Sequence, residues 1–203
     1  MIIAEGIAAA GSWVAGGHRG IATIRRLRGS KGHAGASGQA RRITVSGLDS
    51  PLRVGTVNVH TSGGGISAER VRGSASLSTS GGSIDASDST GDLDVNTSGG
   101  GIRIVDDDGK VAAHTSGGSI RAELHTNHGI NLDTSGGSIT LLLPQGTHAS
   151  IDAGTSGGEV TSNLPFTTTG AVSGNHLHGT IGGGGPAIYL HTSGGSIRIG
   201  PES

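Results

Sequence analysis

The four-residue motif Thr-Ser-Gly-Gly recurs seven times, and it constrains the fold of this chain more than any other feature. Successive motifs are separated by 18, 18, 18, 19, 21 and 37 residues, so the last interval is close to two ordinary ones. A motif that returns at nearly constant spacing indicates a repeat architecture. The motif threonines are Thr61, Thr79, Thr97, Thr115, Thr134, Thr155 and Thr192.

Each repeat contains two short segments in which apolar residues alternate with polar ones. In the repeat that begins at Thr79, Ile84 and Ala86 form the first alternation, and Leu93 and Val95 form the second. Period-two alternation predicts β-strands that are buried on one face. The glycine, serine and aspartate residues between these segments predict tight turns, because glycine accepts positive φ and the other two bond to nearby backbone.

A two-stranded repeat of this size cannot bury its own apolar face, so the repeats must stack. Like strands of successive coils would then pair in parallel, about 4.8 Å apart, around a thin core of Ile, Val, Leu and Ala. The low aromatic content of 1% agrees with such a core. We therefore predict an all-β, single-domain parallel β-solenoid with two short strands per coil of about 18 residues. Its crossovers should be right-handed, and its motif threonines should face inward.

The regular alternation of the solenoid begins at Ile43. We predict an irregular Gly- and Arg-rich N-terminal cap or extension at residues 1–42, followed by the solenoid domain at residues 43–203. Arginines in the first segment could contact phosphates or lipid headgroups. A solvated edge is favoured there, because no aromatic residues lie among the arginines to stack on bases. Near the other end, the 37-residue interval is expected to form one coil and a connection that returns to register at Ile188.

Charge and cysteine content limit the possible partners. The formal net charge is −1, with both signs mixed along the chain, so we expect no nucleic-acid partner. Residues 1–17 lack the basic start of a secretory signal and are too short to cross a membrane, so we expect no direct membrane insertion. The absence of cysteine excludes disulfides but fits several compartments. The bacterial cell envelope and the cytoplasm both stay open as locations, and the oligomeric state is also open.

The strand that follows each motif and the segment at residues 179–199 carry a family resemblance. The strand reads Gly-Gly-Ser-Ile-x-Ala or Gly-Gly-x-Ile-Arg-Ile, and the segment reads GTIGGGGPAIYLHTSGGSIRI. Over about residues 43–199 the chain resembles a bacterial family of adhesin-like repeat domains, the toast-rack domains. This resemblance implies a β-solenoid, a surface or envelope-associated interaction module, and no established enzymatic activity. It supplies no catalytic motif that can be transferred to this chain.

Carboxylates are the first candidates for chemistry, because solenoids can be enzymes. Paired carboxylates at a suitable separation would allow glycoside hydrolysis or lyase chemistry. The acids that could cluster on adjacent coils are Asp85, Asp88, Asp92, Asp94 and Asp106 to Asp108. Their counterparts in neighbouring coils are mostly serine, alanine or arginine, so solvated surface acids are favoured. A carbohydrate-active enzyme on an Asp-bearing face is thus the alternative function, and no catalytic residue is assigned.

Metal binding is expected to be absent. The sequence Gly-Gly-Ser-Ile-Asp lacks the third glycine of calcium-binding rolls, and Asp106 to Gly109 is expected to form a turn. A zinc site needs three or four convergent ligands, whereas His60 and His114 should lie three coils apart. We predict no metal and no cofactor, and a surface pair of His114 with Asp133 on the next coil.

The preferred hypothesis is a non-enzymatic interaction or scaffold module that binds a protein or a surface glycan. Asp85, Arg103 and Arg121 should stack on successive coils, and they are the predicted partner-binding surface. The threonine column also suggests an ice-binding solenoid, which would need its threonines on a flat outer face. The predicted register turns them inward, although a slip by one residue would reverse the two faces.

Overall fold

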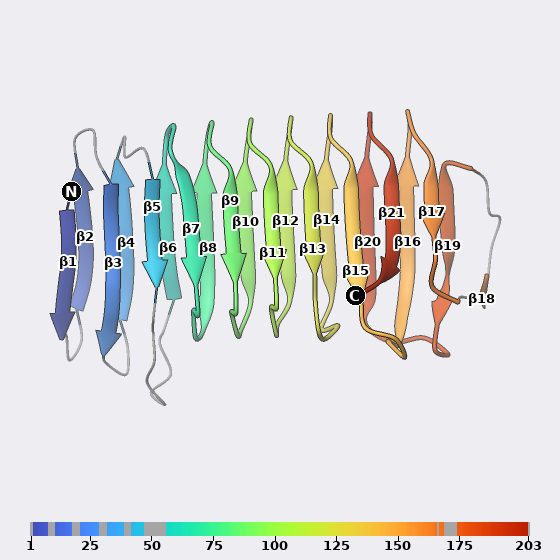
Figure 1. Cartoon of the computed structure of the whole chain (residues 1–203), viewed down its shortest axis with the longest axis horizontal. Helices are drawn as coiled ribbons and strands as arrows, with labels where there is room; N and C mark the ends of the chain where they lie inside the picture. The colour runs from blue at the N-terminus through green and yellow to red at the C-terminus, as the bar shows by residue number, and fades with distance from the viewer. Residues whose placement is uncertain are drawn as a thin grey trace.

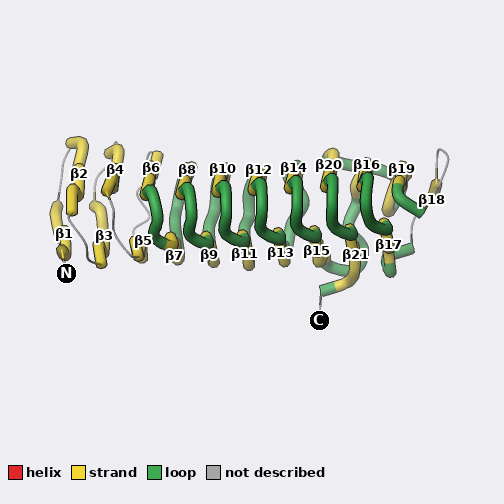
Figure 2. Tube along the Cα trace, turned by 90° about the horizontal axis from the view of Figure 1, so that it is seen from above, coloured by secondary structure: helices red, strands yellow, loops and turns green. Residues whose placement is uncertain are grey.

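A computed structural model describes the backbone of residues 2–7, 11–17, 21–28, 32–38, 42–46, 56–165, 167–168 and 174–202. Side chains are described for residues 44, 56–165, 167 and 174–202. The strands form a ten-stranded sheet A and an eleven-stranded sheet B, which lie face to face and extend along one axis (Figure 1). Seen from above, the strands form two rows that are joined by the turns of each coil (Figure 2). No helix that could cross a membrane occurs in the described residues.

The order of the strands in each sheet departs from their order in the chain near the C-terminus. In spatial order, sheet A contains β1 (Ile2–Ile7), β3 (Ile21–Arg28), β5 (Arg42–Ser46), β7 (Gly65–Glu69), β9 (Ile84–Ser87), β11 (Ile102–Val105), β13 (Ile120–Glu123), β15 (Ile139–Leu143), β21 (Ile197–Pro201) and β17 (Val160–Ser162). Sheet B contains β18 (Thr167–Thr168), β19 (His176–Ile181), β16 (Ala149–Thr155), β20 (Ala187–Thr192), β14 (Ile130–Thr134), β12 (Val111–Thr115), β10 (Leu93–Thr97), β8 (Ser74–Thr79), β6 (Thr56–Thr61), β4 (Gly32–Gly38) and β2 (Gly11–Gly17). Neighbouring strands pair in parallel, except that β19 is antiparallel to both β16 and β18.

The core consists of columns of similar apolar side chains between the two sheets. Ile84, Ile102 and Ile120 are paired partners on β9, β11 and β13, and each is at most 2% exposed. On sheet B, Leu93 pairs with Val111 in the same way. The alternation in the sequence therefore places apolar residues inside and polar residues outside, which confirms the predicted parallel β-solenoid.

The motif threonines form a buried column at one edge of the core, each at most 5% exposed. Thr115 Oγ1 donates a hydrogen bond to the Gly100 carbonyl of the preceding coil at 2.9 Å, and it accepts one from the Gly118 N–H at 3.3 Å. The same two bonds recur at Thr79, Thr97, Thr134, Thr155 and Thr192. This column confirms that the threonines face inward, so they do not form the outer array that ice binding requires.

In six of the motifs the second glycine allows the backbones of neighbouring coils to touch. A Cβ at Gly118 would overlap the Gly100 carbonyl group, and equivalent overlaps occur at Gly82, Gly100, Gly137, Gly158 and Gly195. A Cβ at the first glycine is tolerated better, because at Gly117 its nearest neighbour would be the Ser98 carbonyl oxygen at 3.5 Å. The second glycine is therefore required by close approach between coils.

The C-terminal coil is inserted between two coils that precede it in the chain. Strand β20 pairs with both β14 and β16, and β21 pairs with both β15 and β17. The threonine bonds follow this spatial order, since Thr192 donates to Gly137 and Thr155 donates to Gly195. Ile188 does return to register, as expected. However, the coil of β16, which precedes β20 in the chain, lies on the far side of β20 from β14. Antiparallel β19 covers the outer edge of β16, which would otherwise be open to pairing.

The N-terminal segment differs from the irregular cap that the sequence suggested for residues 1–42. Strands β1 to β4 continue both sheets in parallel pairing. Ala22 and Ile24 of β3 pair with Ile43 and Val45, so the period-two register of the solenoid already applies there. The irregular description is therefore wrong for these strands, whereas a domain boundary at residue 43 stays a prediction. The arginine side chains of this segment lie outside the described residues.

Replacing the second motif glycine should separate the coils. We expect Gly118→Ala to lower the free energy of unfolding by about 1–3 kcal/mol, because the new methyl group meets backbone that cannot move aside. Gly117→Ala is the matched control and should change stability by less than about 0.5 kcal/mol. Urea denaturation followed by circular dichroism measures both. Equal effects of the two substitutions would contradict the close approach at Gly118.

Candidate functional site

A groove of about 650 Å³ crosses the outer face of sheet B and is the main candidate for a binding site. It runs over β8, β10, β12, β14 and β20, where one outward register position supplies its floor. The floor residues are, in order, Ser76, Asp94, Ala112, Asn131 and Tyr189. Tyr189 is 55% exposed and is the one exposed large apolar side chain among the described residues. The volume falls in the usual range of ligand sites.

One wall of this groove is formed by the turn before β14 and the loop before β20. The groove is lined there by His128, Gly129, Pro186 and Ala187. Asn127 links the two segments, because its Nδ2 donates a hydrogen bond to the Pro186 carbonyl oxygen at 3.0 Å. The same Nδ2 also donates to the carbonyl oxygen of His148 at 3.1 Å. The wall is thus held by hydrogen bonds between segments that are far apart in the sequence.

The outer face of sheet A carries the residues that the sequence predicted as a partner-binding surface. Asp85, Arg103 and Arg121 are paired partners on β9, β11 and β13, as expected. The inserted strand β21 adds Arg198 to the same row, one strand beyond Thr140. Arg121 contacts Glu123 at 3.5 Å, whereas Arg103 and Arg198 make no ion pair within the described part of the chain. Their placement agrees with the prediction, and their role in binding remains a hypothesis.

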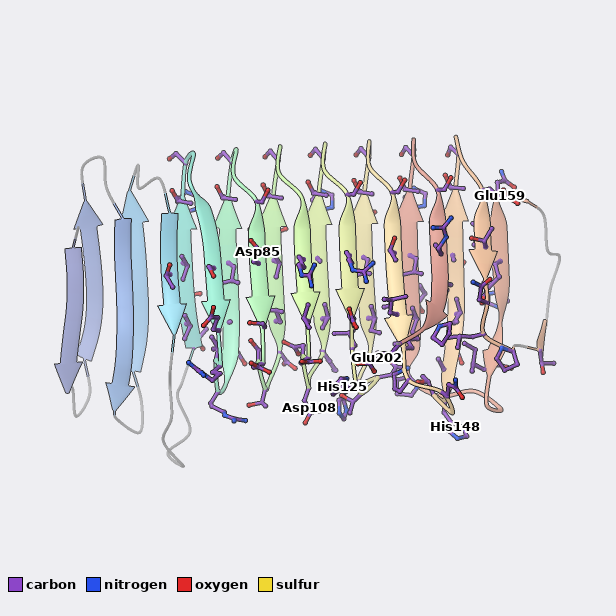
Figure 3. All side chains as sticks on the ribbon, in the orientation of Figure 1. Asp85, Asp108, His125, His148, Glu159 and Glu202 are labelled. Atoms are coloured by element: carbon purple, nitrogen blue, oxygen red, sulfur yellow. The ribbon has the colours of Figure 1, made fainter. Side chains whose placement is uncertain are left out.

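A third group of polar side chains lies on the edge opposite the motif turns. We call this group the acidic edge: Asp106, Asp108, His125, His128 and Glu202. Figure 3 shows His125, Glu202 and Asp108 together there, while Asp85 lies on the strand face of β9. His125 Nε2 is 3.2 Å from Asp106 Oδ1, and its Nδ1 is 2.8 Å from Glu202 Oε1. His128 Nε2 is 3.0 Å from Asp108 Oδ1, which also accepts a bond from the Thr126 hydroxyl at 2.8 Å.

Asp107 is the most perturbed ionisable group of the described residues. It is 2% exposed, and within the described structure neither of its carboxylate oxygens has a hydrogen-bond partner. Burial first, and then the negative charges of Asp108 and Asp92, raise its pKa to about 7. The Ser89 hydroxyl, one coil away, is also buried and without a described partner. Because Asp107 points into the core, its carboxyl group cannot reach a substrate on either outer face.

The Toastrack DUF4097 family model matches residues 34–200. This chain belongs to the Toastrack family. The match covers most of the chain, and the parallel β-solenoid seen in the structure is consistent with this family. No curated protein and no solved structure matches the chain significantly.

The Toastrack fold places two of the carboxylates considered for an enzyme, those of Asp85 and Asp94, in different sheets. Asp85 lies on β9 in sheet A and Asp94 lies on β10 in sheet B, so they face outward on opposite sides. Asp94 instead accepts a hydrogen bond from Asn96 Nδ2 at 2.6 Å. Asp85 and Asp94 therefore cannot form the carboxylate pair that the alternative enzyme hypothesis considered, because successive strands of one coil enter different sheets. The turn acids Asp106 and Asp108 do gather on the acidic edge.

The histidines of the Toastrack domain are partly as expected. His114 Nδ1 lies 3.2 Å from Asp133 Oδ1, which confirms the predicted surface pair. Sequence reasoning did not find the grouping of His125 with Glu202, because the insertion of β21 beside β15 is what brings Glu202 to this edge. The 19-residue interval from Thr115 to Thr134 does mark the longer turn that holds His125 and His128, but it contains no signal for Glu202.

The buried carboxyl group predicts a specific pH dependence of stability. The pKa of Asp107 is raised from 3.8 to about 7 in the folded state. Its contribution to the free energy of unfolding is therefore fully present below about pH 4 and is lost as the pH rises toward 7. The loss is on the order of 4 kcal/mol. In Asp107→Asn, the difference in unfolding free energy between pH 4.5 and pH 8 should shrink by about 3 kcal/mol, because part of the loss already occurs below pH 4.5. Urea denaturation at each pH measures it.

Asp88→Asn is the matched control for this experiment. Asp88 is exposed, lies in the equivalent turn of the preceding coil and has a φ of 53°, which asparagine tolerates. It should keep the pH dependence of the parent protein. An Asp107→Asn variant with the same pH dependence as the parent would show that Asp107 is not the group that titrates.

Proposed function

We propose that this Toastrack domain is a non-enzymatic interaction module that binds an extended glycan in the groove on sheet B. The observation that supports it is the floor of the groove, where one register position is repeated across five strands. Ser76, Asp94 and Asn131 offer hydrogen-bonding groups to sugar hydroxyls. Tyr189 offers an exposed aromatic ring on which the apolar face of a sugar can pack.

The repeat of the solenoid favours a chain-like ligand over a compact one. Equivalent positions of the floor follow each other at about 4.8 Å, so five strands span about 19 Å along the axis. A polymer of similar units can place successive residues over successive strands. The small side chains of Ser76 and Ala112 leave room for it between Tyr189 and the far end of the groove.

A surface glycan as ligand also favours an adhesin-like role at the bacterial cell envelope. In this proposal the domain meets the glycan outside or at the cell boundary and holds it without cleaving it. Of the candidate carboxyl groups, those of Asp92 and Asp94 line the groove. Asp85 lies on the opposite outer face and Asp107 is buried, so neither can pair with them for general acid and base chemistry.

A protein partner with an acidic surface is the second candidate. Its support is the arginine row on sheet A, where Arg103 and Arg198 make no ion pair within the described residues. Such a partner would bind the face opposite the groove, with an association rate that falls steeply as salt is added. The two candidates therefore differ in face and in salt dependence.

Glycan-array binding followed by titration of the best ligand tests the proposal. Tyr189→Ala should weaken binding roughly tenfold or more, as expected for a central aromatic contact. Arg103→Gln, on the other face, is the control and should bind as the parent does. Both positions are exposed, so circular dichroism should show an unchanged fold.

Three results would contradict the glycan proposal. One is the absence of any glycan ligand on the array. A second is loss of binding in Arg103→Gln together with full binding in Tyr189→Ala, which would favour the protein partner on sheet A. The third is shortening of the bound glycan during incubation, which would show enzymatic activity.

A further inference from the structure

We propose that Asp106, His125 and Glu202 bind a divalent transition-metal ion of the zinc type. The three residues follow β11, β13 and β21, so they come from three different coils of the solenoid. One possible ligand atom from each lies within 4.8 Å of the other two. The site belongs to the acidic edge and is separate from the groove, and it does not depend on the proposed glycan ligand.

The hydrogen-bonding capacity of His125 supports a cation at this position. Its two ring nitrogens face two different carboxylates, Asp106 Oδ1 at 3.2 Å and Glu202 Oε1 at 2.8 Å. A neutral imidazole carries a single N–H and can donate to one carboxylate alone, whereas an imidazolium would donate to both. In the neutral ring, the lone pair of the other nitrogen faces a carboxylate oxygen, and these two atoms repel each other. A metal ion bound by both atoms would remove this repulsion.

The combination of ligands indicates which ion fits. One imidazole and two carboxylates resemble the three-ligand sets of zinc sites that leave a fourth position for water. Calcium and magnesium prefer sites made of oxygen atoms, so the imidazole disfavours them. Bonds to zinc of about 2.0–2.2 Å require the ligand atoms to move closer together. Rotation of the side chains can do this, because His125 and Asp106 are 59% and 38% exposed.

A metal ion at this site would stabilise the position of the inserted coil. Glu202 directly follows β21, and its N–H donates to the Leu143 carbonyl of β15 at 2.9 Å. Figure 3 shows His125 and Glu202 close together on this edge. Coordination would add a link from the end of the inserted coil to the turns after β11 and β13. Zinc should therefore protect β21 from local opening.

Isothermal titration of the full chain, purified without a histidine tag and treated with chelator, tests the site with zinc chloride as the probe. We expect one ion per chain and a raised Tm that chelator reverses. His125→Ala and Glu202→Gln should each weaken zinc binding roughly tenfold or more. His114→Ala is the matched control and should bind as the parent does, because His114 pairs with Asp133 at the same 3.2 Å but belongs to no three-ligand group among the residues that the structure describes.

Hydrogen exchange of β21 provides a second readout that does not depend on the affinity of other surface histidines. Zinc should slow exchange in β21 of the parent protein and of His114→Ala, but not of Glu202→Gln. Zinc binding that is unchanged in His125→Ala and Glu202→Gln overturns the proposal. So does equal weakening in His114→Ala, and so does β21 exchange that is the same with and without zinc in the parent.

Discussion

The hydrogen bond that six of the motif threonines donate to the neighbouring coil is the interaction on which the rest of the structure depends. It joins the hydroxyl of a threonine that is at most 5% exposed to a glycine carbonyl at 2.6–2.9 Å, and the same hydroxyl accepts a hydrogen bond from an N–H of its own turn. Two backbone groups are thereby satisfied at a place where the coils touch too closely for water. The second motif glycine permits that contact, so threonine and glycine act as one unit that sets the spacing between coils.

A uniform spacing between coils has a consequence for the outer surfaces. Every outward position becomes a straight row along the axis, so the chemistry of a face is decided by which residue each coil places in that row. On sheet A the row contains Arg103, Arg121 and Arg198, and on sheet B the equivalent row forms the floor of the groove that ends at Tyr189. The core stays almost constant from coil to coil while these rows vary. Binding properties can therefore change without a change in the fold.

The sequence was sufficient for the local structure and insufficient for the order of the coils. Alternation of residues such as Ile84 and Ala86 predicts strand, face and register, because burial of one face leaves a single acceptable pairing. Spatial order is different, since Ile188 fits equally well above any coil of the same register. The position of β20 beside β14 therefore could not be read from periodicity. The grouping of Glu202 with His125 depends on that order, and for this reason the sequence did not reveal it.

The inserted coil also affects how such a chain can reach its final state. The coil of residues 149–162 and the coil of residues 130–143 are not adjacent. The coil of residues 187–201, which is synthesised later, lies between them. Most neighbouring coils of this solenoid are close in sequence and can assemble progressively as the chain leaves the ribosome. Here closure must wait for a distant segment, with the larger loss of chain entropy that distant contacts require. We therefore expect the insertion of β20 and β21 to come late in folding, and the strand edges that are open until then are where pairing with another chain would begin.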